Sequence, residues 1–222
     1  MNSAFPKPKA YLEDPWIIAS RALTKLHSWW VSSTYPFPSV GRNLSVHHTT
    51  IWSRRIAPGI RIGNSVIIRN HAWINTFELE NSTDGVKIDI GDRCVINAQC
   101  VISAKNRIII ERDVMVSACS LIMDHNHAYE DVTRTIQSQG ATSGGTIRIE
   151  EGCWIGHGAA IVCGQGELVL GRNCVVAANA LVTRSFPPHS VIVGNPARLA
   201  KQFDPATESW VGATSRPVLG QR

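Results

Sequence analysis

The chain has 222 residues, of which 44% are hydrophobic, so it is long enough for one large domain with a substantial core. Its formal net charge is +5, but no basic run with interleaved aromatic residues accompanies that charge, which argues against nucleic-acid binding. Neither a signal peptide nor an apolar run near the roughly 20 residues that span a bilayer is visible, so we expect a cytoplasmic protein.

Residues 1–43 are expected to form an N-terminal arm and a helix. Asp14-Pro15 suits an N-cap and a first helical position, and from Trp16 to about Val31 the apolar residues recur at helical spacing. Apolar residues share one side of this helix and basic residues lie away from it: Ile18, Ala22, Leu26 and Trp29 or Trp30 on the apolar side, Arg21 and Lys25 elsewhere. Two interpretations stay open. The helix packs against the main domain or a sister subunit, or residues 15–31 contact the inner face of a membrane as a peripheral helix.

Residues 44–203 carry a repeat in which large aliphatic residues recur every six positions. The clear sets are Ile62, Ile68 and Ile74; Ile90, Ile96 and Ile102; Ile110, Val116 and Ile122; Ile149, Ile155 and Ile161; and Leu170, Val176 and Val182, after a weaker set of Leu44, Thr50 and Ile56. A small residue repeatedly follows the aliphatic one at the fourth place, and alternate strand positions share a face, so both point inward. The pattern predicts a triangular parallel solenoid of about six coils, with three short strands and three corners per coil.

Two features of the repeat concern its small residues. Glycine or a turn-tolerant polar residue often follows the aliphatic one, as at Gly63, Gly91 and Gly171, and we interpret this position as a corner with unusual backbone angles. Four cysteines occupy the inward small position, where a thiol acts as a small hydrophobic group: Cys94, Cys100, Cys153 and Cys174. With no CxxC motif present, this usage favours a reducing compartment.

The repeat is interrupted at several places. A short turn is expected near residues 81–85, and the largest excursion runs near 123–148, after the hydrophobic stretch that leads into His125 and His127. Long excursions from a rigid scaffold often carry function. A smaller insertion at 165–167 is expected to bulge beside the site, and residues 204–222 are expected to form an irregular tail.

Three C-terminal motifs carry a resemblance to a known family: Cys153-Trp-Ile-Gly156, then Ala178-Asn-Ala-Leu-Val-Thr-Arg184, then Gly194-Asn-Pro-Ala-Arg198. They resemble the hexapeptide-repeat acyltransferases, in particular the maltose and galactoside O-acetyltransferases and the related polysaccharide O-acetyltransferases. The resemblance implies a homotrimer of left-handed β-helices, with acetyl-CoA in a groove between subunits and no metal. It also implies a loop histidine that acts as the general base.

The resemblance places a role on individual positions of this chain. His125 matches the general base, and because imidazole ionises near neutral pH it can take a hydroxyl proton as the oxygen attacks the thioester directly. A backbone N–H of Gly156-His157 matches the donor to the oxyanion. Asn97 matches an acceptor contact, although Asn also suits a corner, and His127 either orients the acceptor or shapes the loop. The coenzyme A positions are Trp154, Ala178, Thr183, Arg184, Arg198 and Lys201.

The chain departs from the sugar acetyltransferases at Ala104-Lys105, where they have an acidic residue that holds the acceptor. We therefore expect a sugar hydroxyl of a surface or exported polysaccharide, or of its precursor, rather than a simple galactoside or maltose. A serine, amino-sugar or antibiotic acceptor stays open. So does a zinc carbonic anhydrase of the same fold, which needs three histidines; here His125 and His127 are two apart, and His71 and His157 lie on other coils. Asp124, Glu130 and Asp131 are the acidic residues that can orient an imidazole.

Overall fold

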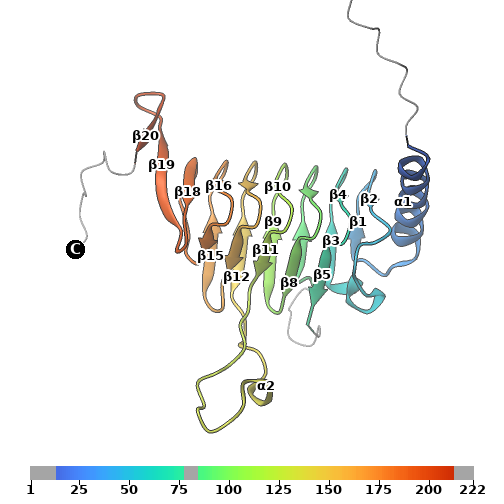
Figure 1. The fold of residues 1–222 in the computed structure, drawn as a ribbon, viewed down its shortest axis with the longest axis horizontal. Helices are drawn as coiled ribbons and strands as arrows, with labels where there is room; N and C mark the ends of the chain where they lie inside the picture. Colours follow the sequence, from blue (N-terminus) through green and yellow to red (C-terminus); the bar gives the residue numbers. More distant parts are fainter. Residues whose placement is uncertain (1–13, 78–84, 213–222) are drawn as a thin grey trace, which may run out of the picture.

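The computed structural model describes residues 14–77 and 85–212, and most of the turn expected near 81–85 lies outside these ranges. The chain winds as a parallel β-helix of three sheets, as the sequence predicts (Figure 1). The six-stranded sheet contains β1 (Ser39–Val40), β3 (Ile60–Ile62), β6 (Ile88–Ile90), β9 (Arg107–Ile110), β12 (Thr146–Ile149) and β15 (Glu167–Leu170). The five-stranded sheet contains β5 (Trp73–Thr76), β8 (Val101–Ala104), β11 (Leu121–Met123), β14 (Ala160–Val162) and β17 (Leu181–Val182).

The nine-stranded sheet runs the length of the molecule. Its strands are β2 (Ser45–Val46), β4 (Ile67–Ile68), β7 (Val95–Ile96), β10 (Met115–Val116), β13 (Trp154–Ile155), β16 (Val175–Val176), β18 (Ser190–Val193), β19 (Arg198–Asp204) and β20 (Ser209–Gly212). The pairs are parallel up to β18, and β18–β19 and β19–β20 are antiparallel. This terminal hairpin corrects the prediction of an irregular tail after residue 203, because Asp204 continues β19 and Ser209–Gly212 pair with it as β20.

The hydrophobic core fills the inside of the coils with the two residue classes that the repeat identifies. In the five clear sets the aliphatic residues are buried, and so are the small residues that follow the first two of each set, including Cys100 and Ser120. The prediction that Leu44, Thr50 and Ile56 form the first set is wrong. Val40 pairs with Ile62, so the first coil begins at Ser39 rather than at residue 44. The 3₁₀ helix η1 (Arg54–Gly59) lengthens this coil, so counting hexads backward loses the register.

The corners also differ from the prediction. Positive φ occurs at the third residue after the aliphatic one, for example Ser65, Arg93 and Asp113 with φ of 56°, 57° and 60°. The glycine directly after the aliphatic residue has a different cause, which is close stacking. A Cβ on Gly91 would lie 2.7 Å from the backbone N of Arg112 in the next coil. Glycine is therefore required there because successive coils touch, not because of its backbone angles.

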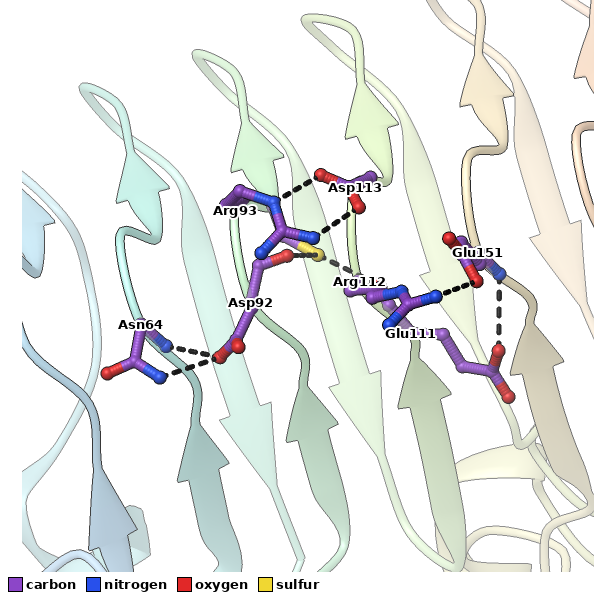
Figure 2. Close-up of polar contacts among 8 residues, drawn as sticks. Asn64, Asp92, Arg93, Glu111, Arg112, Asp113 and Glu151 are labelled. Atoms are coloured by element: carbon purple, nitrogen blue, oxygen red, sulfur yellow. Dashed lines mark hydrogen bonds and ion pairs between the residues drawn. The ribbon is translucent and has the colours of Figure 1, made fainter.

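Charged and amide side chains link successive coils at the corner between the six-stranded and nine-stranded sheets (Figure 2). The pairs are Asn64 with Asp92, Arg93 with Asp113 and Arg112 with Glu151. The Arg93 guanidinium, donating at 2.6 Å, holds the pKa of the Asp113 carboxyl below its ordinary value. These residues are exposed or half-buried, so their contribution to stability is small.

The helix α1 (Pro15–Thr34) covers the N-terminal end of the β-helix (Figure 1). Ser28 bonds both backbone groups of Val46, which point away from the next coil and would otherwise be an open sheet edge. Val31 is buried beside it. In the described residues no helix combines the length and the apolar character needed to cross a membrane.

The long excursion leaves the β-helix as a loop with the short helix α2 (Ile136–Gln139), seen projecting from the coils in Figure 1. It covers residues 124–145, slightly less than predicted, because Thr146–Ile149 pair as strand β12 with β9 and β15. The insertion at 165–167 lies in the following coil at the same corner, where Gly145 N–H reaches the Cys163 carbonyl at 3.2 Å. The long excursion and the insertion at 165–167 therefore meet at one corner.

Candidate active site

The site is built at the corner where the five-stranded sheet turns toward the six-stranded sheet. We call it the histidine corner: residues 77, 104–106, 124–126, 163–166 and 183–184, which follow β5, β8, β11, β14 and β17. The hydrophobic strand β11 ends at Met123, and the chain then places Asp124 and His125 at the base of the long loop. Both side chains are buried. A carboxylate with as little exposure as that of Asp124 needs hydrogen-bond partners inside the protein.

Asp124 has those partners. Its Oδ1 accepts the backbone N–H of Lys105 at 2.7 Å, and its Oδ2 accepts that of Asn106 at 2.8 Å. The backbone of Asp124 is tied as well, since its carbonyl accepts the Gly145 N–H. The carboxylate is therefore fixed in position by the preceding coil.

His125 is held by this carboxylate. Its Nδ1 lies 2.9 Å from Asp124 Oδ1, and its ring meets the edge of Phe77 at a centroid distance of 4.7 Å. With Nδ1–H donating to a carboxylate, Nε2 carries the lone pair. The arrangement has the two functional parts of a general base, a proton acceptor and an anion that stabilises the imidazolium. Of the acidic residues considered from the sequence, Asp124 orients the imidazole, whereas Glu130 and Asp131 bond the loop backbone.

Lys105 has a place that the sequence did not reveal. Its Nζ donates to the Ala141 carbonyl at 2.8 Å and lies 5.8 Å from the Phe77 ring centre. It thus joins the histidine corner to the far side of the loop. His127 is exposed and pairs with Ala141 through a backbone bridge, so the contact seen for it is with the loop.

A cavity of about 740 Å³ opens beside the corner. Its walls come from the loop and from the following coils, and they include Asn126, Tyr129, Thr142, Gly164, Gln165 and Thr183. The insertion at 165–167 therefore supplies part of the cavity wall through Gln165. Thr183, which the sequence assigns to coenzyme A, also lies there.

Other predicted residues lie at a different corner, which we call the asparagine corner: residues 97–98, 117–118, 156–158 and 177–179, between the nine-stranded and five-stranded sheets. Asn97 Nδ2 donates to the Val116 carbonyl at 2.9 Å, which leaves its Oδ1 as the free end. Gly156 N–H donates to the Val176 carbonyl at 2.8 Å, so it is committed to the sheet. Of the two backbone N–H groups matched to the oxyanion donor, that of His157 is therefore the one left to donate. A single chain does not bring this corner together with His125.

The remaining coenzyme A positions gather at the C-terminal coils. Trp154, Val175, Val191 and Lys201 form one row across β13, β16, β18 and β19, by their pairing register. Arg198 begins β19 and is exposed, as is Ala178 at the asparagine corner. Trp154 Nε1 donates to Ser117 Oγ at 2.9 Å, which fixes the indole against the sheet. Arg184 stacks on Phe186 at the other corner, 5.1 Å from the ring centre.

Exposed cations suit the phosphates of coenzyme A, and an indole suits its adenine. The predicted coenzyme A positions therefore fit that molecule. In the described part of the chain, no three His, Cys, Asp or Glu side chains are grouped so that they could hold a metal ion.

Comparison with known proteins gives relatives of one kind. No protein-family model matches the chain. It is 27% identical over 199 residues to "Probable acetyltransferase Rv3034c" of Mycobacterium tuberculosis, a match that covers 84% of this chain and 61% of that protein. The chain thus spans about three fifths of that relative. It is also 27% identical over 163 residues to WbbJ of Escherichia coli, whose name assigns it to lipopolysaccharide biosynthesis as an O-acetyl transferase; 64% of this chain and 79% of WbbJ are covered.

Among solved structures, the fold is similar to that of AntD, an N-acyltransferase from Bacillus cereus that was crystallised with dTDP and coenzyme A. The TM-score is 0.62 at 21% identity, and the match covers 78% of this chain and 87% of AntD. The relatives in sequence carry acetyltransferase names, and the fold is the one the repeat predicts. The chain is therefore a left-handed parallel β-helix whose sequence and fold resemble those of the hexapeptide-repeat acyltransferases.

Proposed function

We propose that the protein transfers an acetyl group from acetyl-CoA to a sugar hydroxyl of a surface or exported polysaccharide, or of its precursor. The observation that carries this proposal is the buried His125 at the base of the long loop, held through Nδ1 by a fixed carboxylate. The name of WbbJ supports a hydroxyl acceptor on a polysaccharide. The lysine at position 105, where sugar acetyltransferases have an acidic residue, supports an acceptor other than a simple galactoside or maltose.

In the proposed reaction His125 Nε2 takes the proton of the acceptor hydroxyl while the oxygen attacks the thioester carbonyl of acetyl-CoA. The C–S bond then breaks, and the imidazolium returns the proton to the leaving thiolate. Asp124 stabilises the imidazolium during both steps. His157 N–H is the proposed donor to the oxyanion, and Asn97 Oδ1 the proposed acceptor contact. No acyl-enzyme is formed.

We propose further that the active unit is a homotrimer in which the histidine corner of one copy faces the asparagine corner of its neighbour. The separation of the two corners within one chain supports this, since neither alone holds all the groups that the reaction needs. The outer face of the five-stranded sheet also carries an apolar row in pairing register: Trp73, Val101, Leu121, Ala160 and Leu181. An apolar row that continues through all the coils suits burial against another subunit.

The proposal is tested by thiol release from acetyl-CoA in the presence of sugars, nucleotide sugars, oligosaccharides, amino sugars and serine. We expect release with a glycan acceptor and a product whose acetyl group is removed by hydroxylamine, because esters are cleaved under conditions that amides survive. A product resistant to hydroxylamine would assign the amino-sugar alternative. Absence of both thiol release and acetyl-CoA binding would contradict the acyl-transfer proposal itself.

A further inference from the structure

The N-terminal helix α1 is oriented opposite to an ordinary surface helix. Its side toward the β-helix is mostly polar: Ser20 Oγ lies 3.2 Å from His47 Nε2, and Ser28 bonds the backbone of Val46. Its apolar side faces outward, with Ile18, Leu26 and Trp29 exposed by 53%, 62% and 63%. A helix that only covered the end of the β-helix would be expected to bury its apolar side.

The inward polar side has a structural reason. The helix covers an open sheet edge, whose N–H and C=O groups need hydrogen-bonding side chains rather than aliphatic ones. Ser28 satisfies both groups of Val46, and His27 Nδ1 lies 3.2 Å from the same carbonyl. Within residues 14–77 and 85–212, no comparable hydrogen-bonding need explains the outward apolar side. The helix lies at the end of the β-helix (Figure 1), yet Ile18, Leu26 and Trp29 remain exposed.

Basic residues border the apolar side. Arg21 and Lys25 of α1, together with Arg69 of the second coil, line a cavity of about 590 Å³ between the helix and the coils. The lining also contains Trp16 and His47 and includes no acidic residue. An apolar surface with tryptophan, edged by cations, matches the boundary between acyl chains and anionic headgroups of a bilayer.

From this geometry we propose that α1 docks the protein on a membrane surface rich in anionic phospholipid. Ile18, Leu26 and Trp29 enter the acyl boundary, and Lys25 and Arg69 bind headgroup phosphates. Because the docking side lies at one end of the β-helix, the coils stand away from the bilayer and the histidine corner stays accessible. The proposal does not depend on the acyl-transfer chemistry, since it rests on different residues and is tested without substrate.

The test is co-sedimentation of the full chain with phosphatidylcholine vesicles, with and without about a third of phosphatidylglycerol, at about 0.1 M and about 0.5 M salt. We expect binding to the anionic vesicles that weakens at the higher salt. Leu26→Ser with Trp29→Ser should weaken it at least about tenfold, since two apolar side chains no longer leave water. Lys25→Gln with Arg69→Gln should weaken it by about fivefold per charge at the lower salt.

The matched control is Val132→Ser with Trp210→Ser, which removes exposed apolar side chains elsewhere and should leave binding unchanged. All of these side chains are exposed, so the variants are expected to fold, and circular dichroism checks this. The proposal is overturned if the wild type does not bind anionic vesicles or if the α1 variants bind as well as the control. It is also overturned if, without lipid, the variant with Leu26→Ser and Trp29→Ser has a lower mass in solution than the wild type. That result would show that a second copy of the chain covers the helix.

Discussion

At the scale of single residues, the site depends on a hydrogen-bonded pair of sequence neighbours. Asp124 and His125 are adjacent in the chain, yet their side chains meet at 2.9 Å because the strand ends there and the backbone turns. Backbone N–H groups from the preceding coil hold the carboxylate, so the orientation of the imidazole is set by the stacking of coils rather than by the rest of the loop.

Asp124→Asn tests this orienting role. The amide keeps an acceptor for one backbone N–H but carries no charge to stabilise an imidazolium, so kcat should fall about 10- to 100-fold. The KM for acetyl-CoA should change little, because the hydrogen-bond partners of the Asp124 carboxylate are Lys105, Asn106 and His125, none of which is a coenzyme A position. Steady-state kinetics with the acceptor found in the panel measure both constants.

The matched control is Asp131→Asn, which changes an exposed loop acid whose partner is Thr133. It should leave kcat within about twofold. Equal losses of kcat in the two variants, or a loss in Asp124→Asn confined to KM, would contradict an orienting role for Asp124.

The sequence identified His125 because it stands at the largest break in the repeat and matches a family motif. It did not identify the roles of Phe77 and Lys105. Each lies at the end of a strand in an earlier coil, and its contact with the loop depends on how coils stack. A pattern along the chain shows which residues share a corner only once the length of every coil is known.

At the scale of elements, the repeat is held by glycines that let coils approach closely. Gly91→Ala would put a methyl group 2.7 Å from backbone atoms of the next coil, which cannot move without breaking the ladder. We expect the free energy of unfolding to fall by about 1–3 kcal/mol, the usual cost of overpacking. Urea denaturation followed by circular dichroism measures it.

Gly166→Ala is the comparison. That glycine has φ of +70° and nothing within 4 Å of its Cβ, so it tests backbone angle without a clash. Its cost should be near about 1 kcal/mol. If Gly91→Ala is neutral, close stacking is not what requires glycine at this position.

The packing of α1 on the first coils should depend on pH through His47. Burial first, and then the neighbouring His48, His71 and His27, lower the pKa of His47 from its ordinary value. The unfolded chain, in which histidine ionises near about 6.5, therefore binds this proton more readily than the folded protein. The contribution to stability is complete above that pH and is lost as the pH falls toward the folded pKa.

Thermal unfolding between about pH 7.5 and about pH 5.5 checks this expectation. The melting temperature of the wild type should fall over this range by more than that of His47→Gln, which cannot be protonated. The charged side chains of Arg21, Lys25 and Arg69 line the same cavity as His47. Parallel curves for the wild type and His47→Gln would show that His47 is not the group responsible.

The two ends of the molecule show where reasoning from sequence stops. The sequence predicts α1 and its apolar stripe, but the direction of that stripe depends on the open sheet edge that Ser28 satisfies. The β19–β20 hairpin was missed because its pairing is antiparallel and has no hexad period. In the central coils, where each residue repeats the environment of its predecessor, the prediction holds.

At the scale of the whole molecule, a shared site predicts that two defective chains can repair each other. In a trimer whose sites combine His125 from one copy with Asn97 from its neighbour, every mixed trimer of His125→Ala and Asn97→Ala chains has one intact site, about a third of the wild-type number. Co-expression with different affinity tags isolates the mixed trimers. Their mass should be near three times 24.3 kDa, about 73 kDa.

The control pairs two variants at one corner, His125→Ala with Asp124→Asn. Every site in this mixture then contains a defective histidine corner, so little activity should return. If mixed trimers of the right mass regain activity in neither of the two mixtures, the whole site lies within one chain. A stable monomer with full activity would also contradict the shared groove.

The central claim is that His125 is the base in acetyl transfer, and the most direct measurement compares thiol release by the wild type and by His125→Ala at saturating acetyl-CoA and acceptor. The account predicts a loss of at least about 100-fold in kcat, the scale of a general base. Binding of acetyl-CoA, measured by calorimetry, should be retained. A His125→Ala protein that turns over as fast as the wild type would contradict the account and move the base elsewhere, with His127 the first residue to examine.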